Sequence, residues 1–160
     1  MTRFAELLAR LTEAGVEMVI VGGLAVISHG YVRATLDLDV CYARTPENIR
    51  RLVAAVAPLH PRLRGAPEGL PFFWDESTIR NGLNFTLVTD LGDLDLLGEI
   101  TGLGNYNDVA LRAIEVELHG RAVRILELGD LIRSKAAAGR AKDLVDLEAL
   151  RAIAAGNKTS

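Results

Sequence analysis

The stretch VGGLAVISHGYVRATLDLDV, residues 21–40, holds the densest set of structural and chemical signals in the chain. The β-branched run Val16–Val21 at its start is typical of a buried strand, and two glycines come directly after it. The segment 24–29 then predicts a short helix, closed by Gly30. Because glycine has no Cβ, the N–H groups of such a strand-to-helix turn can approach a phosphate closely. A Gly-Gly turn is common without any ligand, so it indicates a phosphate site only in combination with other motifs.

A second strand is predicted over Leu36–Tyr42, because apolar and polar side chains alternate there. The alternation places Asp37 and Asp39 on one face, about 6.6 Å apart at two strand rises. At that separation, two carboxylates can converge on one divalent ion or hold a pair of ions. Carboxylate oxygens favour Mg²⁺ or Mn²⁺, particularly where phosphate oxygens complete the coordination. An isolated Asp-x-Asp pattern on a strand is more often a solvated edge.

A third carboxylate is available from a predicted hairpin formed by Leu83–Thr89 and Asp93–Leu97. Asp93 and Asp95 share one face of the second of these strands. If this strand lies beside the Asp-x-Asp strand, one of the two carboxylates can reach the metals or act as a general base toward an acceptor hydroxyl. The alternation alone leaves open which of the two does so.

The rest of the chain predicts helices and strands that interleave without a regular βαβ rhythm. The further expected elements are a helix over 4–11, a helix starting at Thr45-Pro46, a long loop over 58–71 with room for one irregular strand, a hairpin over 114–126 and a helical tail over 128–155 that breaks near Gly139. This order predicts an α+β (mixed α/β) fold, with a mixed β-sheet, flanking helices and a helical C-terminal tail. We expect one domain over residues 1–160, with its core at 16–153.

The composition argues against several classes of protein. Eighteen basic and 21 acidic residues among 160 give a net charge of -3, which argues against a protein that coats nucleic-acid phosphates. Cys41 is the only cysteine, which excludes an internal disulfide and suits a reducing compartment. No apolar run approaches the roughly 20 residues needed to cross a bilayer. We therefore expect a cytoplasmic protein without a membrane segment.

Two further side chains have both a structural and a functional interpretation. Cys41 lies after the aspartates on the same strand face, and Trp74 lies after the proline-rich loop. The thiol could line a site and the indole could stack on a base, but core packing is favoured for both. The three histidines lack metal-ligand spacing, and one cysteine cannot build a zinc site.

The combined run Gly22-Gly23…Gly30-x-x-Arg33-x-Thr35-x-Asp37-x-Asp39 resembles the signature of the nucleotidyltransferase fold of the DNA polymerase beta superfamily. Its order of motifs is most similar to that of the AbiEii/AbiGii toxin-like nucleotidyltransferases. The segment Leu91–Leu97 is similar to the strand that carries the family's third carboxylate, and the segment 131–146 resembles the family's helical tail. The resemblance covers residues 16–153.

The resemblance implies how phosphates and metal ions would be held. Gly22 and Gly23 would hold a triphosphate, and Asp37 and Asp39 would bind two Mg²⁺ (or Mn²⁺) ions. The register of the family's strand favours Asp95 over its neighbour as the residue that completes one metal site and activates the acceptor.

The resemblance also assigns cationic residues. Arg33 and Thr35 would shape the loop that enters the metal strand, with Arg33 touching a phosphate. Lys135 would neutralise charge on the triphosphate. Arg140 and Lys142 would either assist or have a structural role beside the acidic residues of the tail.

The implied activity is metal-dependent transfer of a nucleoside monophosphate from a nucleoside triphosphate to a hydroxyl on an RNA end such as that of tRNA, a small molecule or a protein. A toxin–antitoxin pair is a candidate setting. Many relatives are longer and carry a C-terminal helical domain that helps to recognise the acceptor. A second copy of the chain in a homodimer, a cognate antitoxin protein or the proline-rich loop would take that role here. The alternative is a non-catalytic nucleotidyltransferase-fold binding or antitoxin module.

Overall fold

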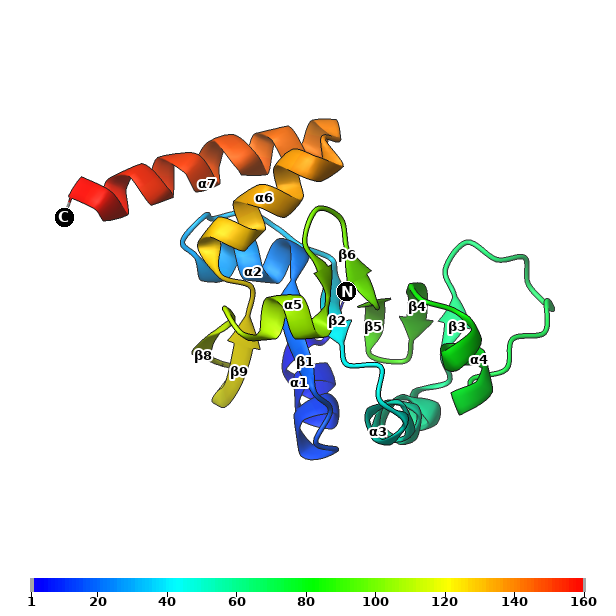
Figure 1. Cartoon of the computed structure of the whole chain (residues 1–160). Coiled ribbons are helices and arrows are strands. Elements are labelled where there is room, and N and C mark those ends of the chain that lie inside the picture. Colours follow the sequence, from blue (N-terminus) through cyan, green and yellow to red (C-terminus); the bar gives the residue numbers. More distant parts are fainter. Residues whose placement is uncertain (1, 160) are drawn as a thin grey trace.

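The computed structural model describes residues 2–159, which form a mixed β-sheet with helices around it (Figure 1). Its helices are α1 Phe4–Glu13, α2 Gly22–Ser28, α3 Pro46–Val56, α4 Glu76–Asn81, α5 Tyr106–Ala110, α6 Leu128–Ala138 and α7 Ala141–Thr159, with a 3-10 turn, η1, at Ala57–Leu59. Its strands are β1 Met18–Val21, β2 Asp37–Tyr42, β3 Arg62–Leu63, β4 Phe85–Thr89, β5 Gly92–Leu97, β6 Glu99–Ile100, β7 Gly104–Asn105, β8 Ile114–Leu118 and β9 Arg121–Ile125. The predicted α+β (mixed α/β) class with a helical tail is confirmed.

Seven strands form one sheet in the order β3-β4-β5-β2-β1-β9-β8, and β6 and β7 pair separately. β1 runs antiparallel to β2 and parallel to β9, whereas β2 runs parallel to β5. In consequence, the C-terminal ends of β1 and β9 and the N-terminal ends of β2 and β5 lie at the same end of the sheet. Figure 1 shows α2, α6 and α7 at this end of the molecule and α1 and α3 at the other. The predicted Gly-Gly turn and the predicted aspartates therefore lie together at this end of the sheet.

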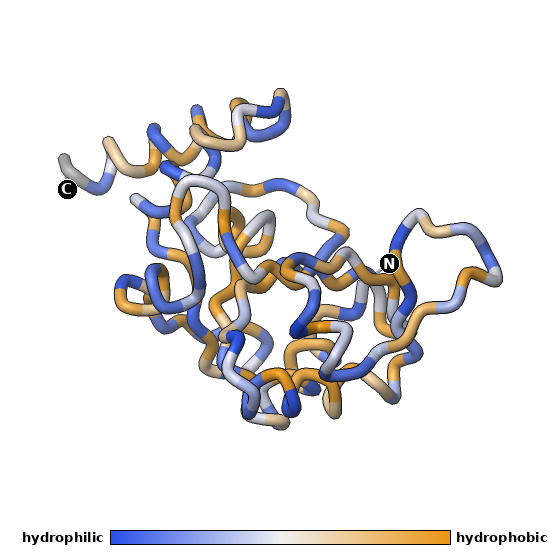
Figure 2. The backbone as a smooth tube through the Cα atoms, turned by 45° about the vertical axis from the view of Figure 1, so that its right-hand side comes forward, coloured by the Kyte–Doolittle hydropathy of each residue, from blue (hydrophilic) through white to orange (hydrophobic). Residues whose placement is uncertain are grey.

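Local sequence signals explain several of these elements. Leu7, Leu8 and Leu11 on one face of α1 are fully buried. At the start of α3, the hydroxyl of Thr45 accepts a hydrogen bond from the backbone N–H of Asn48 at 3.2 Å, as the Thr-Pro pair predicts. The tube in Figure 2 is predominantly hydrophobic along the central strands, which form the middle of the core.

The structure differs from the predicted elements in three places. The short elements α4, α5 and the β6–β7 pair were not predicted. Leu36, predicted as the first residue of a strand, lies outside β2 and is 71% exposed. The helix after the strand β1 begins at Gly22 itself and not at residue 24. The loop expected over 58–71 contains one short strand, as predicted: the two-residue β3, which pairs with β4 at the edge of the sheet.

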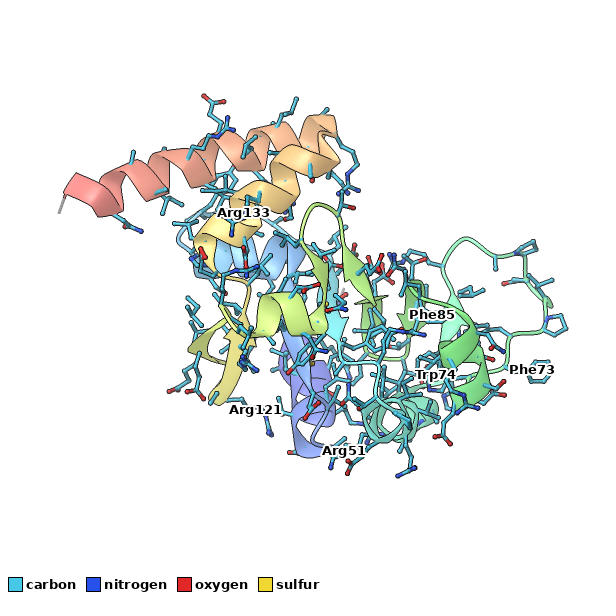
Figure 3. All side chains as sticks on the ribbon, in the orientation of Figure 1. Arg51, Phe73, Trp74, Phe85, Arg121 and Arg133 are labelled. Carbon is cyan, nitrogen blue, oxygen red and sulfur yellow. The ribbon has the colours of Figure 1, made fainter. Side chains whose placement is uncertain are left out.

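The predicted packing role of Trp74 is confirmed. Its indole N–H donates a hydrogen bond to the backbone carbonyl of Val53 on α3 at 3.1 Å, and its ring packs against the core. The neighbouring Phe73 is 72% exposed and points away from the molecule (Figure 3).

The helical tail folds as two helices joined at Gly139, which has a left-handed φ of 64°. α6 and α7 pack against each other, and α7 extends beyond the sheet toward the C-terminus (Figure 1). Within residues 2–159, no helix has the length and apolar character needed to span a membrane.

Candidate active site

Four carboxylates lie together where β2 and β5 begin. The parallel pairing of these strands sets Asp37 opposite Asp93 and Asp39 opposite Asp95. The intervening Leu38 is fully buried, and because successive side chains point to opposite faces, the aspartates are directed to the other face of the sheet.

Three of the four carboxylates converge. One oxygen each of Asp37, Asp39 and Asp95 lies within 4.8 Å of the other two, the one such His/Cys/Asp/Glu group of metal-binding geometry that residues 2–159 contain. Asp93 does not belong to this triad. Strand register therefore brings Asp95, which the family's strand favours, beside the Asp-x-Asp pair.

The triad is electrostatically strained. Burial, followed by the carboxylates of Asp95 and Asp37, raises the pKa of Asp39 to about 7. Burial and the charge of Asp95 also raise the pKa of Asp37. In addition, Oδ1 of Asp39 is buried and has no hydrogen-bond partner within the described part of the chain. A buried acceptor in this state lacks a cation or a donor.

The two glycines are required by close contacts with the motif residues that come after them in the chain. Gly22 has a φ of 64°, and a Cβ there would lie 1.9 Å from Oδ2 of Asp39. A Cβ at Gly23 would lie 2.5 Å from Oγ1 of Thr35 and 3.1 Å from the guanidinium of Arg33. The Gly-Gly pair, Arg-x-Thr and Asp-x-Asp thus form one packed unit, which explains their spacing in the sequence.

Lys135 belongs to a buried ion-pair network. Its Nζ lies 3.3 Å from Oδ1 of Asp143 and 3.0 Å from Oδ2 of Asp146. Arg33 contacts both carboxylate oxygens of Asp146, at 3.0 and 3.1 Å, and Arg140 contacts Asp143 at 2.6 Å. Both acidic side chains are buried. The network therefore ties α6, α7 and the loop before β2 into one frame.

These ion pairs lower the pKa of Asp143. Burial alone would raise the pKa of Asp143, but the hydrogen bond from Arg140 and the charge of Lys135 outweigh it and lower that pKa. Lys142 differs from its neighbours: it is exposed, makes no ion pair within the described residues, and its charge acts on Asp37. Of Lys135 and Lys142, which both line the cleft, Lys142 is therefore the one without a carboxylate partner among the described residues.

Arg64 is a contact residue that the sequence patterns do not reveal. Its Nη2 lies 2.7 Å from Oδ1 of Asp95, its Nε 3.4 Å from Oδ2 of Asp93 and its Nη1 3.9 Å from Oδ2 of Asp37. Burial opposes its charge, but the hydrogen bond to Asp95 and the surrounding carboxylates raise its pKa. A single guanidinium, directly after the edge strand β3, thus bridges Asp37, Asp93 and Asp95.

A cleft of about 1140 Å³ borders the carboxylate triad, the Gly-Gly turn and the ion-pair network of the tail. Every residue predicted for the site lines it: Gly22, Gly23, Arg33, Thr35, Asp37, Asp39, Asp95 and Lys135. Asn84, Thr86, Glu99 and Thr101 line it too. Cys41 does not: it is fully buried, and burial raises the pKa of its thiol to about 12, as the core interpretation predicts.

The fold is similar to that of solved nucleotidyltransferase structures. A crystal structure of ANT(2")-Ia in complex with adenylyl-2"-tobramycin matches with a TM-score of 0.58 and 16% identity, over 98% of this chain and 95% of that one. A proposed nucleotidyltransferase from Thermotoga maritima matches with a TM-score of 0.57 and 16% identity, over 92% and 93%. A solution structure of ANT(2'')-Ia, called an antibiotic-resistance factor, matches at 0.55 and 17%, over 98% and 89%. These likenesses show the fold.

No curated protein matches the sequence significantly. A family model described as "Nucleotidyltransferase of unknown function (DUF6036)" matches residues 1–155, almost the entire chain. With the Gly-Gly turn and the carboxylate triad in place, the chain belongs to this family of nucleotidyltransferases.

Proposed function

We propose that the protein transfers a nucleoside monophosphate from a nucleoside triphosphate to a hydroxyl group and releases pyrophosphate, with Mg²⁺ or Mn²⁺ held by Asp37, Asp39 and Asp95. The observation that carries this proposal is the convergence of three carboxylates within 4.8 Å beside the Gly-Gly turn. That arrangement brings metal ligands and a phosphate-accessible backbone to one wall of one cleft.

The residues fit a hard divalent cation. The donor set consists of carboxylate oxygens alone, which suits Mg²⁺ or Mn²⁺. Oδ1 of Asp39 is buried without a hydrogen-bond partner among the described residues, as expected of an atom that has a cation as its natural partner. When bound, such ions neutralise phosphate charge and align an in-line displacement.

The chain's own residues would bind and orient the substrates. Gly22 and Gly23, which line the cleft at the start of α2, would offer backbone N–H groups to phosphate oxygens, and Lys142 supplies an exposed charge. Arg33, Thr35 and Lys135 hold the loop and helices that shape this wall; the ion pairs of Arg33 and Lys135 with Asp146 favour a framing role over direct phosphate contact. Asp95 would accept the proton of the acceptor hydroxyl.

The acceptor would enter beside Asn84, Thr86 and Thr101. An RNA end, a small molecule and a protein hydroxyl would all be served by the same core, since the fold specifies the transfer site and not its target. The adenylyl-2"-tobramycin named in the ANT(2")-Ia structure supports the small molecule among the three. We further propose that the protein acts in the cytoplasm. If it shares the toxin–antitoxin role of the AbiEii/AbiGii proteins that it resembles, its partner would be a second copy of the chain or an antitoxin protein.

The direct test is to incubate the protein and Mg²⁺ with each labelled nucleoside triphosphate, alone, with total RNA and with an aminoglycoside. We expect label transfer to one class of acceptor and release of pyrophosphate. Folded protein that binds no triphosphate in equilibrium dialysis would contradict the proposal.

The alternative function is a non-catalytic binding or antitoxin module. One observation favours it: Arg64 already supplies the acidic cluster with a counterion. Under this alternative, replacing both Asp37 and Asp39 by Ala would leave partner binding and biological activity unchanged. Loss of biological activity in that variant, with partner binding retained, would favour the enzyme.

Stabilisation by Mg²⁺ is expected to depend on pH. Asp39 titrates near 3.8 in an unfolded chain and at about 7 in the folded protein. Between these values the folded state holds the extra proton, so this carboxyl's contribution to the free energy of unfolding is present at acidic pH and lost as pH rises through about 7. A metal ion replaces that proton. Thermal melts with and without Mg²⁺ should therefore show a larger gain in Tm at pH 8 than at pH 6; equal gains would contradict this.

Lys142→Gln is expected to raise the Kd for the triphosphate about fivefold, because one exposed charge near the phosphates is removed. Arg151→Gln removes an exposed charge from the same helix outside the cleft and serves as the matched control. Isothermal titration of both variants, at 50 and 300 mM salt, measures the effect; an equal change in both would show that Lys142 has no specific contact.

A further inference from the structure

The guanidinium of Arg64 lies beside two of the three carboxylates that would hold a divalent cation. It contacts Asp95 at 2.7 Å, and Asp37 lies within 3.9 Å, so two of the three triad members face it. The third, Asp39, is the cross-strand neighbour of Asp95. A monovalent cation at these distances repels an incoming divalent ion and satisfies part of the negative charge that attracts one.

The backbone holds Arg64 at this position. Its N–H donates to the carbonyl oxygen of Thr86 at 2.9 Å, which continues the β3–β4 ladder by one residue. Nη2 also donates to the carbonyl of Leu87 at 2.8 Å. The side chain therefore crosses β4 to reach β5, anchored at both its ends.

Asp93 gives Arg64 a partner outside the triad. Its Oδ2 lies 3.4 Å from Nε of Arg64, and Asp93 does not converge with the other three carboxylates. When a metal ion draws Asp95 and Asp37 toward itself, the guanidinium can stay paired with Asp93. Asp93, which does not belong to the triad, would thus serve as the partner of Arg64.

We propose that Arg64 is a positioning residue that acts as the resident counterion of the carboxylate triad, competes with the divalent cation for Asp95, and so sets the metal affinity of the site. This inference rests on the proposed metal site. Arg64 keeps the cluster from repelling itself in the metal-free protein, and it stays paired with Asp93 when the metal binds.

The test compares Arg64→Gln with Arg62→Gln. Arg62 lies two residues earlier, in the edge strand β3 itself, but it is exposed and makes no ion pair within residues 2–159. Both variants lose one positive charge at this edge of the sheet, and only Arg64→Gln loses the contacts with the carboxylates. Mn²⁺ binding without nucleotide is measured by electron paramagnetic resonance, and Tm is measured without and with saturating Mn²⁺.

We expect Arg64→Gln to lower the Kd for Mn²⁺ about tenfold and to lower the Tm of the metal-free protein, with Mn²⁺ restoring the Tm. Arg62→Gln should change the Kd by less than about twofold, because an exposed charge is screened. Arg64→Lys, which keeps the charge without the planar fork, should fall between wild type and Arg64→Gln.

Two results would overturn the inference while leaving the metal site intact: unchanged or weaker Mn²⁺ binding by Arg64→Gln, or an equal gain in Arg62→Gln. Absence of Mn²⁺ binding in wild type and in Arg64→Gln alike would overturn the proposed metal site and this inference together.

Discussion

Asp39→Asn is expected to lower kcat on the order of 10³-fold and to abolish Mn²⁺ binding, because Asp39 belongs to the triad and carries its unpartnered buried oxygen. The same change should raise the Tm of the metal-free protein at pH 8. Burial and the carboxylates of Asp95 and Asp37 destabilise the charged form of Asp39, and an amide of the same shape removes that charge. The substitution therefore lowers activity and raises stability, as expected for a site whose carboxylates repel one another until a cation binds between them.

Asp95→Asn and Asp93→Asn form the matched pair for this prediction. Both residues lie on β5 and face the same side of the sheet, but Asp95 alone converges with Asp37 and Asp39. Asp95→Asn should match the loss in Asp39→Asn, and Asp93→Asn should stay within about tenfold of wild type. Equal losses in the pair would mean that Asp93 shares the metal-binding role. A fall in the Tm of metal-free Asp39→Asn at pH 8 would contradict the electrostatic account.

The longer elements could be predicted because each carries its own local signal. Thr45-Pro46 marks the start of α3, and the strand alternation places Asp37 and Asp39 on one face. The missed helices α4 and α5 have six and five residues, too few for a hydrophobic period to emerge. Their signals were polar: Asp75 accepts a hydrogen bond from the N–H of Thr78, and Asn105 and Asp108 form a capping box.

The site could be predicted where its residues are neighbours in sequence or share a strand register. Arg64 could not, because its contact with Asp95 depends on the sheet order β3-β4-β5, and β3 has only two residues. The pairing of Lys135 with Asp143 and Asp146 depends in turn on how α7 folds back on α6 after Gly139. The spacing of Asp143 and Asp146, three residues apart on one helix face, was the available signal for a buried partner.

Gly22→Ala is expected to destabilise the protein and to lower its activity at least about 10²-fold. The left-handed φ of 64° costs an alanine on the order of 1–2 kcal/mol, which is a fall in Tm of about 2–8 °C for a chain of this size. The added methyl would also lie 1.9 Å from Oδ2 of Asp39, a distance that no relaxed structure tolerates. Asp39 must then move, and with it the geometry of the triad.

Gly120→Ala separates these two effects. Gly120 has a similar φ of 76° in the turn between β8 and β9, but a Cβ there meets nothing within 4 Å. Its alanine variant should lose a comparable amount of Tm from backbone strain and keep full activity and Mn²⁺ affinity, since the turn lies outside the cleft. If Gly22→Ala lost no more Tm than Gly120→Ala and kept its Mn²⁺ affinity, the contact with Asp39 would have no energetic weight. The glycine would then serve the turn alone, and the close approach of α2 to β2 would not explain the Gly-Gly motif.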